Sequence, residues 1–253
     1  MWDEVVAKLA RLEALDMQCQ VFGADHHRYR LFPCLPKEDL SRLERWLGVP
    51  FPDELRAFYR DVGNGVAGPY YGLREAEAIK GYNPSKPYTQ AATLRAFAQS
   101  RGLAEEGEDY FELGREYLAG LITIIDEGCG HEVCLVTTGL RAGEVVRVSL
   151  EGYVYETNQT LIKTYDLWLD REIEKFETVR RMMSDGSSVD EINQEVRAKF
   201  DTLDGEDVIA SIANVEKPVE LFGTAHHKIY HGATQTPWYE NVLCEWQKTN
   251  TTS

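Results

Sequence analysis

The sequence predicts an α+β fold, in which helices come first, an antiparallel sheet follows and a further helix closes the domain. Three observations indicate this order. Apolar residues recur at helical spacing before residue 63, short β-branched runs separated by turns occupy residues 121–157, and helical spacing returns over residues 165–181. Helices and strands that stay segregated along the chain are typical of α+β folds rather than of alternating βαβ units.

Three amphipathic helices are expected at the start of the chain. The first covers residues 2–15, the second follows Pro36, and the third starts at Pro52, a residue favoured in a first helical turn. Each helix places apolar residues three or four positions apart on one face. These positions are Trp2, Val5, Leu9 and Leu12, then Leu40, Leu43 and Leu47, then Leu55, Phe58 and Val62.

A glycine-rich loop, GNGVAGPYYG, follows the third helix. Its composition excludes regular structure and predicts positions at positive φ, so Gly63, Gly65, Gly68, Pro69 and Gly72 are structural residues. A phosphate cradle is the alternative. However, the loop lacks the Lys and Ser/Thr of a P-loop, and it follows a helix where nucleotide loops follow a strand.

The same loop supplies the candidate partner-binding residues, Tyr70, Tyr71 and Asn64. Rigid aromatic side chains on a shaped loop make good contact anchors, because binding energy concentrates in a few central residues. The turn is expected to pack these two rings.

An antiparallel meander is expected next, formed by residues 121–126, 133–138, 144–150 and 152–157. The turn between its first two strands is built on Asp126, Gly128, Cys129 and Gly130. A helix at 91–101 precedes the meander, after an irregular stretch that contains Pro84 and Pro87, and a helix at 165–181 follows it. Residues 1–180 are therefore expected to form the main domain.

Residues 181–253 are expected to form a small, mostly helical or irregular appendage of unknown function, packed on the main domain. Residues 184–188 are a linker, and Ser188 with Glu191 is a capping box that opens a helix through Phe200. Packing is expected because Trp238, Tyr239, Leu243 and Trp246 are too apolar to leave in water. FGTAHHK at 222–228 repeats the spacing of FGADHHR at 22–28, through duplication or convergence.

Charge and composition exclude several classes of function. Lys and Arg number 27 against 42 Asp and Glu, a net charge of −15, and no basic cluster is present, so no nucleic-acid partner is expected. No membrane partner is expected either, since no apolar run approaches the length of a span and the first residues are acidic where a signal peptide is basic. The five cysteines are scattered without a CxxC pair, which favours small core residues in a cytoplasmic protein.

Two groups of residues could suggest a metal. Asp126, Cys129, His131 and Cys134 offer ligand chemistry, but alternation along a strand separates Cys134 from the turn, so a β-turn with small buried thiols is favoured. The pairs His26–His27 and His226–His227 could assemble one site, yet adjacent side chains diverge, and one packed and one exposed histidine is the simpler expectation. No nucleophile motif, paired carboxylates or HExxH helix is present, so no catalytic residue, metal or cofactor is predicted.

The segment GVPFPDELRAFYRDVGNGVAGPYYGL at 48–73 resembles the signature of the SUKH superfamily, in which a helix opened by a Pro-acidic step leads into a GNG loop. FGADHHRYRL at 22–31, DEGCGHEVCLVTTGLRAGEVVRV at 126–148 and YDLWLD at 165–170 are similar to further segments of its bacterial members. The resemblance implies an α+β recognition domain, found in bacterial and viral toxin-immunity proteins and in fungal regulators of cell-wall signalling.

Three functions remain open at this point. The leading interpretation is a non-enzymatic immunity protein that neutralises a bacterial toxin of the nuclease or deaminase class by direct contact, with a basic toxin domain as its protein partner. The second is a cytoplasmic adaptor or regulator of the same fold. The third, from a different class, is an enzyme with a histidine-bound metal.

Overall fold

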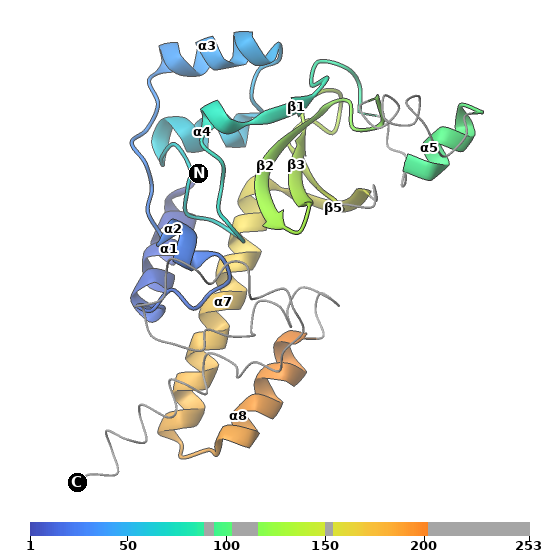
Figure 1. Cartoon of the computed structure of the whole chain (residues 1–253). Helices are drawn as coiled ribbons and strands as arrows, with labels where there is room; N and C mark the ends of the chain where they lie inside the picture. Colours follow the sequence, from blue (N-terminus) through green and yellow to red (C-terminus); the bar gives the residue numbers. More distant parts are fainter. Residues whose placement is uncertain (89–93, 103–115, 150–153, 202–253) are drawn as a thin grey trace. The chain divides into compact units, whose positions relative to one another are not determined.

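The computed structural model describes residues 1–88, 94–102, 116–149 and 154–201 (Figure 1). The chain divides into two compact units, which are described separately. Unit 1 comprises residues 1–6 and 29–167 and holds the sheet. Unit 2 comprises residues 7–28 and 168–253, and its described residues are mainly helical. Helix α1 (Asp3–Leu15) begins in unit 1 and continues in unit 2.

The sheet of unit 1 is an antiparallel meander of five strands in the order β1-β2-β3-β4-β5. The strands are β1 (Lys80–Tyr82), β2 (Leu121–Gly128), β3 (His131–Val136), β4 (Glu144–Val148) and β5 (Val154–Thr160). The α+β fold with an antiparallel meander is thus confirmed. The short strand β1 was not expected, because it lies in the stretch interpreted as irregular.

The turn between β2 and β3 is the predicted hairpin. Gly128 pairs with His131, and the two residues between them, Cys129 and Gly130, have φ of 51° and 81°. Positive φ at both central positions is the geometry that matches the right-handed twist of the flanking strands. The hairpin between paired strands is therefore confirmed.

The cysteines do not all lie in the core. Cys134 on β3 is buried and Cys19 is partly buried, but Cys34 and Cys129 are exposed. The expectation of small buried thiols is wrong for these two residues. Cys129 occupies the tip of the two-residue turn, where no neighbouring strand can cover the side chain.

The helices α3 (Lys37–Leu47), α4 (Asp53–Asp61) and α5 (Leu94–Ser100) of unit 1 pack apolar side chains inward, as predicted. The short helix η1 (Ala76–Ala78) was not expected, because it lies in the stretch interpreted as irregular. Leu55 and Phe58 on α4 are buried, and the Trp2 ring meets the Phe58 ring edge-on at 4.9 Å between centroids. Edge-to-face contacts of this kind stabilise beyond the area they bury.

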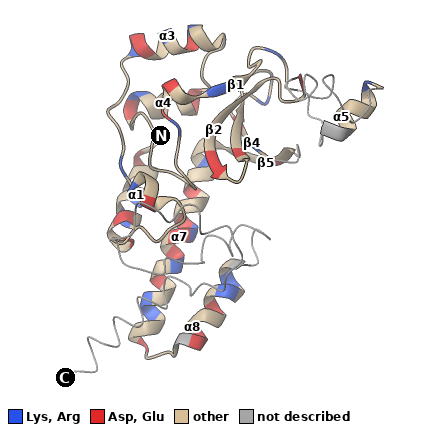
Figure 2. Cartoon of the chain, viewed as in Figure 1, with Lys and Arg blue, Asp and Glu red and all other residues tan. Residues whose placement is uncertain are grey.

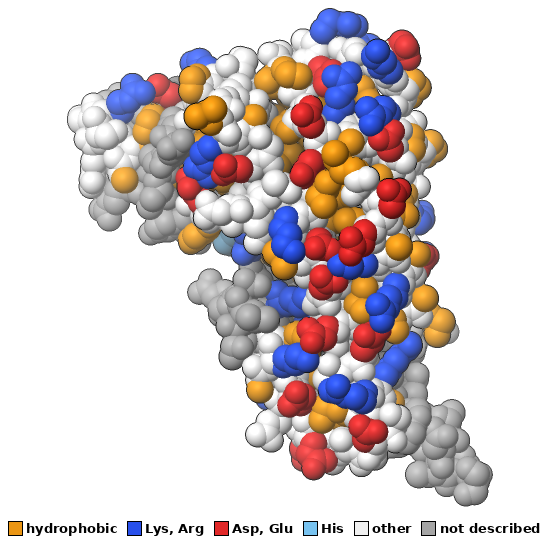
Figure 3. All heavy atoms as spheres, turned by 180° about the vertical axis from the view of Figure 1, so that it is seen from behind, with side chains coloured by type: hydrophobic (Ala, Val, Ile, Leu, Met, Phe, Trp, Pro, Cys, Tyr) orange, Lys and Arg blue, Asp and Glu red, His pale blue; other side chains and the backbone are white. Residues whose placement is uncertain are grey.

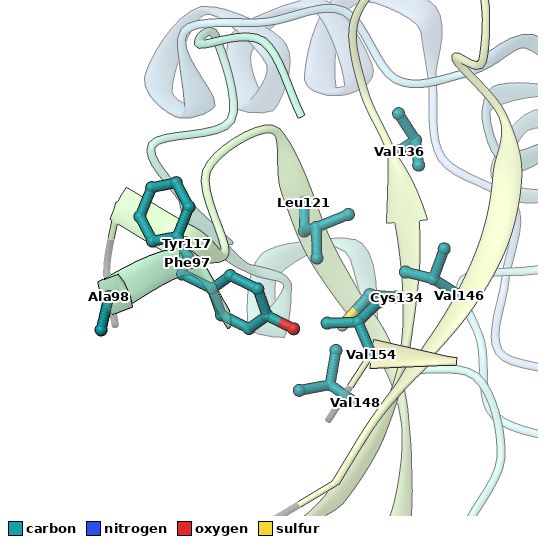
Figure 4. Close-up of a cluster of buried hydrophobic side chains, with 9 residues drawn as sticks. All are labelled: Phe97, Ala98, Tyr117, Leu121, Cys134, Val136, Val146, Val148 and Val154. Carbon is teal, nitrogen blue, oxygen red and sulfur yellow. The ribbon is translucent and has the colours of Figure 1, made fainter. Parts of the chain in front are cut away.

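A second cluster covers one face of the sheet (Figure 4). Phe97 and Ala98 from α5, with Tyr117, pack against side chains that share this face because they alternate along their strands. The strand residues are Leu121, Cys134, Val136, Val146, Val148 and Val154. Both faces of the sheet are therefore apolar, which explains why its central strands contain continuous apolar runs.

Unit 2 contains α2 (Ala24–His27), most of α7 (Leu161–Ser184), α8 (Val189–Val196) and the π-helical turn η2 (Arg197–Asp201). Helix α7 starts four residues earlier than predicted, directly after β5. The capping box is confirmed, since Ser188 Oγ accepts from the Glu191 amide and the Glu191 carboxylate accepts from the Ser188 amide. His27 is buried and His26 is exposed, as expected for that pair.

Several ion pairs lie on the surface of unit 2. Arg11 pairs with Glu177, Lys8 lies 2.7 Å from Asp170, and Lys199 lies 2.7 Å from Glu174. Figure 2 shows acidic and basic residues interspersed along α7. Trp168 on α7 is partly buried.

Several expectations fall on residues 202–253, which lie outside the described residues. They concern His226, His227, Trp238, Tyr239, Leu243, Cys244 and Trp246. The assignment of residues 181–253 to an appendage packed on residues 1–180 therefore stays a prediction. Within the described part of the chain, no helix has the length and hydropathy that crossing a membrane requires.

Candidate partner-binding surface

Two buried tyrosines bind the backbone on either side of Tyr70 and Tyr71, one within the loop at 63–72 and one just after it. The Tyr59 hydroxyl on α4 donates to the Arg74 carbonyl oxygen at 2.7 Å, and the Tyr165 hydroxyl on α7 donates to the Ala67 carbonyl oxygen at 3.0 Å. Burial raises the pKa of both phenols well above the ordinary value, so both remain protonated and keep donating. Two fixed points from different helices leave the loop little freedom.

The loop requires glycine for two reasons, a positive φ at some positions and a lack of space for a side chain at others. Gly65 and Gly72 have φ of 77° and 89°, which confirms that the loop contains positive-φ positions. Space is the second need. A Cβ on Gly63 would lie 2.7 Å from the Phe32 carbonyl oxygen, and a Cβ on Gly68 would overlap the Tyr165 hydroxyl.

Asn64 connects the loop to η1. Its side chain is buried, with 7% of the residue exposed. The Asn64 amide nitrogen donates to a Glu77 carboxylate oxygen at 2.9 Å, and its oxygen accepts from the Ala76 amide at 2.9 Å. These bonds orient Asn64 into the protein, so it fixes the loop; its partner-binding role stays a prediction.

The end of the loop runs beside strand β2. The Tyr71 amide donates to the Asp126 carbonyl oxygen at 3.3 Å, and the Arg74 amide donates to the Ile124 carbonyl oxygen at 2.8 Å. These bonds place Tyr70 and Tyr71 next to the β2–β3 hairpin. The structure therefore brings together two motifs that lie more than fifty positions apart in the sequence.

Tyr70 and Tyr71 are half-buried, which leaves part of each ring accessible. Tyr70 has a φ of 54°, and its ring centroid lies 5.9 Å from the guanidinium carbon of Arg147 on β4. Arg147 also forms a bidentate ion pair with Glu127 at 2.8 Å for both bonds. We call the surface formed by Tyr70, Tyr71, Asp126, Glu127 and Arg147 the loop–hairpin face.

Carboxylates predominate around this surface. Arg74 lies 3.5 Å from Asp126 and 3.8 Å from Glu132, so one guanidinium serves two carboxylates. The Thr123 hydroxyl donates to Glu132 at 2.9 Å. Burial and the nearby Glu132 carboxylate raise the pKa of Tyr82, whose hydroxyl lies 3.4 Å from Glu132. The carboxylates of Asp126, Glu127 and Glu132 thus outnumber the guanidiniums of Arg74 and Arg147 by one, and each carboxylate is paired with one of these guanidiniums.

The possible metal ligands at the hairpin are not brought together. One Asp126 carboxylate oxygen accepts from the Gly128 amide at 2.8 Å, which shapes the turn. Cys129 is exposed at the tip, whereas Cys134 is buried within the sheet, where burial raises the pKa of its thiol to about 12. Among the described residues, no group of three or more His, Cys, Asp or Glu side chains is placed to hold a metal ion.

Sequence reasoning missed Glu127, Arg147 and Arg74. The signal available for Arg147 was a charged residue within the apolar run EVVRV, where the strand pattern expects another valine. Its partner could not be inferred, because Glu127 lies on β2 and the two strands are separated by β3.

A comparison with protein-family models identifies one match in this region. The model of the SMI1 / KNR4 family (SUKH-1) matches residues 34–167, more than half of the chain, from α3 through the sheet to the start of α7. The chain belongs to the SMI1 / KNR4 family. The SUKH resemblance of the loop and hairpin motifs is thereby confirmed, and the match includes every residue of the loop–hairpin face. Members of this family are generally immunity or regulatory proteins rather than enzymes. No curated protein matches the chain.

Proposed function

We propose that this SMI1 / KNR4 family member is a non-enzymatic immunity protein that neutralises a bacterial toxin of the nuclease or deaminase class by direct contact in the cytoplasm. The observation that carries the proposal is the fixed presentation of Tyr70 and Tyr71 on the family's own loop, held by the hydroxyls of Tyr59 and Tyr165. A preorganised aromatic pair loses little conformational entropy on binding, so more of its contact energy appears as affinity.

Size and chemistry make the loop–hairpin face suitable as the centre of such an interface. A stable complex buries about 800 Å² per partner, and its binding energy concentrates in a few tyrosine, tryptophan or arginine anchors. Tyr70, Tyr71 and Arg147 are side chains of these types and lie together. We expect them to hold the complex while the surrounding residues exclude water.

Charge supports a basic partner. The chain carries a net charge of −15, and carboxylates outnumber guanidiniums by one at and beside the loop–hairpin face. A toxin that acts on nucleic acid needs cationic groups at its active site, since phosphate contacts supply most of its affinity. Opposite charge speeds the encounter of two such proteins, and an acidic protein seated over the toxin's active site would exclude its substrate.

The experiment is co-expression with the toxin domain encoded by a neighbouring gene, with cell survival as the readout. We expect the wild-type protein to restore growth and the double variant Tyr70→Ala, Tyr71→Ala to lose most of that protection. Trp46→Ala is the matched control, because Trp46 is a 72% exposed aromatic side chain on α3 and is not among the residues of the loop–hairpin face. Failure of the wild-type protein to bind or protect against the toxin would exclude the immunity role and favour the adaptor function.

A further inference from the structure

The end of the sheet opposite the hairpin presents two large apolar side chains to water. Trp46 on α3 is 72% exposed, and Leu140 in the turn between β3 and β4 is fully exposed at 106%. A lone exposed apolar residue is ordinary, but tryptophan is depleted on protein surfaces and enriched where binding energy concentrates. The exposure of these two residues therefore requires a physical explanation.

Segments distant in sequence converge at this end of unit 1. A Cβ on Gly81, at the middle of β1, would lie 3.2 Å from the Leu47 side chain at the end of α3 and 2.9 Å from Pro84. The turn after β3 joins the same region, because the Thr138 hydroxyl donates to the Lys86 carbonyl oxygen at 3.0 Å. A Cβ on Gly143, at the end of this turn, would lie 3.8 Å from Pro52.

The turn that carries Leu140 is well defined. The Gly143 amide donates to the Val136 carbonyl oxygen at 2.8 Å, and the Arg141 guanidinium pairs with Glu144 at 2.7 Å and with Glu156 at 2.6 Å. Leu140 is thus an apolar side chain held in water on an ordered turn. Trp46 likewise projects from a regular helix.

Three cations at this end of unit 1 have no ion-pair partner among the described residues. The segments that converge here, residues 42–53, 80–88 and 137–144, contain five Lys and Arg and three Asp and Glu; Arg42 and Arg141 also pair with Asp39 and Glu156, which lie outside these segments. Of the three carboxylates, Glu44 is buried and Glu144 is paired with Arg141. Within the described part of the chain, Arg45, Lys80 and Lys86 are exposed and form no ion pair. Figure 3 shows basic and acidic side chains next to one another over the part of unit 1 that contains α3.

We infer that this region, which we call the turn-end surface (Arg45, Trp46, Lys80, Lys86 and Leu140), is a second protein-docking site that binds an acidic segment with apolar side chains from a partner protein. The apolar anchors match the partner's apolar side chains, and the unpaired cations match its carboxylates. Opposite charges across an interface suppress wrong partners and set the register of binding. An overall charge of −15 makes a local cationic surface selective, because acidic segments are repelled elsewhere on the protein.

The turn-end surface is separate from the loop–hairpin face. The two lie at opposite ends of β3, whose six residues span roughly 17 Å at about 3.4 Å per residue. The inference does not depend on the identity of the toxin or on the immunity role.

The test uses the full chain and two arrays of short random peptides. One array is built from Asp, Glu, Leu, Phe, Ser and Gly, and the other substitutes Lys and Arg for the acidic residues. We expect binding to be confined to the acidic array, and the affinity of the strongest peptide, measured by fluorescence anisotropy, to fall about tenfold in Trp46→Ala. Lys80→Glu combined with Lys86→Glu should weaken it similarly, with a smaller effect at high salt.

Matched controls distinguish a specific docking site from non-specific binding. Tyr155→Ala and Tyr70→Ala should bind the peptide as the wild type does, and Trp46→Phe should retain part of the affinity. All variants should keep the wild-type melting temperature, since the altered side chains are exposed or partly exposed. Equal binding to both arrays, no binding to the acidic array, or an affinity unchanged in Trp46→Ala would overturn the inference.

Discussion

The loop at 63–72 and two turns at the other end of the sheet require glycine for different reasons. In the loop at 63–72, a Cβ on Gly63, Gly65 or Gly68 would meet backbone or a buried ring, so close packing requires glycine. At the other end, Gly48 and Gly139 have positive φ, but a Cβ on either residue would have no neighbouring atom within 4 Å, so only backbone conformation requires glycine at these two positions. The loop packs against buried residues and presents half-buried aromatic rings, while the turn-end surface presents the exposed side chains of Trp46 and Leu140.

The largest change in the free energy of unfolding is expected where glycine is required by close packing. Gly68→Ala places a methyl group on the Tyr165 hydroxyl, which must move and lose its bond to the Ala67 carbonyl, so the free energy of unfolding should fall by about 3 kcal/mol. Gly139→Ala, which meets only the positive-φ penalty, should cost about 1 kcal/mol. Urea unfolding measures both, and equal losses for the two variants would remove the distinction between the ends.

A substitution at Asn64 gives the next test, because it can remove the hydrogen-bond donor while keeping the shape of the side chain. Asn64→Asp keeps an acceptor for the Ala76 amide but places a carboxylate beside that of Glu77, and should destabilise by about 2 kcal/mol at neutral pH. Asn64→Asp combined with Glu77→Gln should recover much of that loss, since a donor again faces the carboxylate. A double variant no more stable than the single one would contradict the assigned contact.

The buried phenols make a pH-dependent prediction. Burial raises the pKa of Tyr59 and Tyr165 in the folded state, so their contribution to stability is complete below the unfolded pKa of about 10 and is lost as the pH rises above it. Tyr165→Phe should cost about 1 kcal/mol at pH 7 through its lost bond to Ala67. Its unfolding free energy should then decline less steeply than that of the wild type above pH 10, as thermal melts across alkaline buffers can show.

The smallest changes in the free energy of unfolding are expected at the turn-end surface. Leu140→Ser should change the free energy of unfolding by less than about 0.5 kcal/mol, because the side chain contacts water rather than a core. Calorimetry measures this directly. A loss of more than about 1 kcal/mol would show that Leu140 is packed, which would remove the basis for treating it as a docking anchor.

Most of the fold could be predicted from the sequence because most of its elements are determined by residues that are close together in the chain. The apolar faces of α4 and of the first helix, the capping box of α8 and the two-residue hairpin at Cys129–Gly130 each depend on neighbouring residues alone. Strand β1 has no such local cause. Its residues, Lys80 to Tyr82, include a glycine and precede Pro84, and they become a strand only because β2 offers pairing partners from Leu121 to Thr123.

The candidate site was predictable in position but not in detail. The tyrosines and the glycines stand out in the loop sequence, whereas the burial of Asn64 depends on η1 and the pairing of Glu127 with Arg147 depends on three strands. The exposure of Cys129 follows from its place at a turn tip rather than from residue type. The contacts and burial of these side chains depend on residues distant in sequence, so a local sequence pattern cannot predict them.

We propose that the hairpin end of the sheet, with Tyr70 and Tyr71, is the surface that binds the toxin. Hydrogen exchange of the backbone amides, compared between the free protein and its complex with the toxin domain encoded by a neighbouring gene, tests this directly. We predict that binding slows exchange in residues 68–74 and 126–132 and leaves residues 139–144 unchanged. Slowed exchange confined to residues 139–144, with the loop and the hairpin unaffected, would contradict the account.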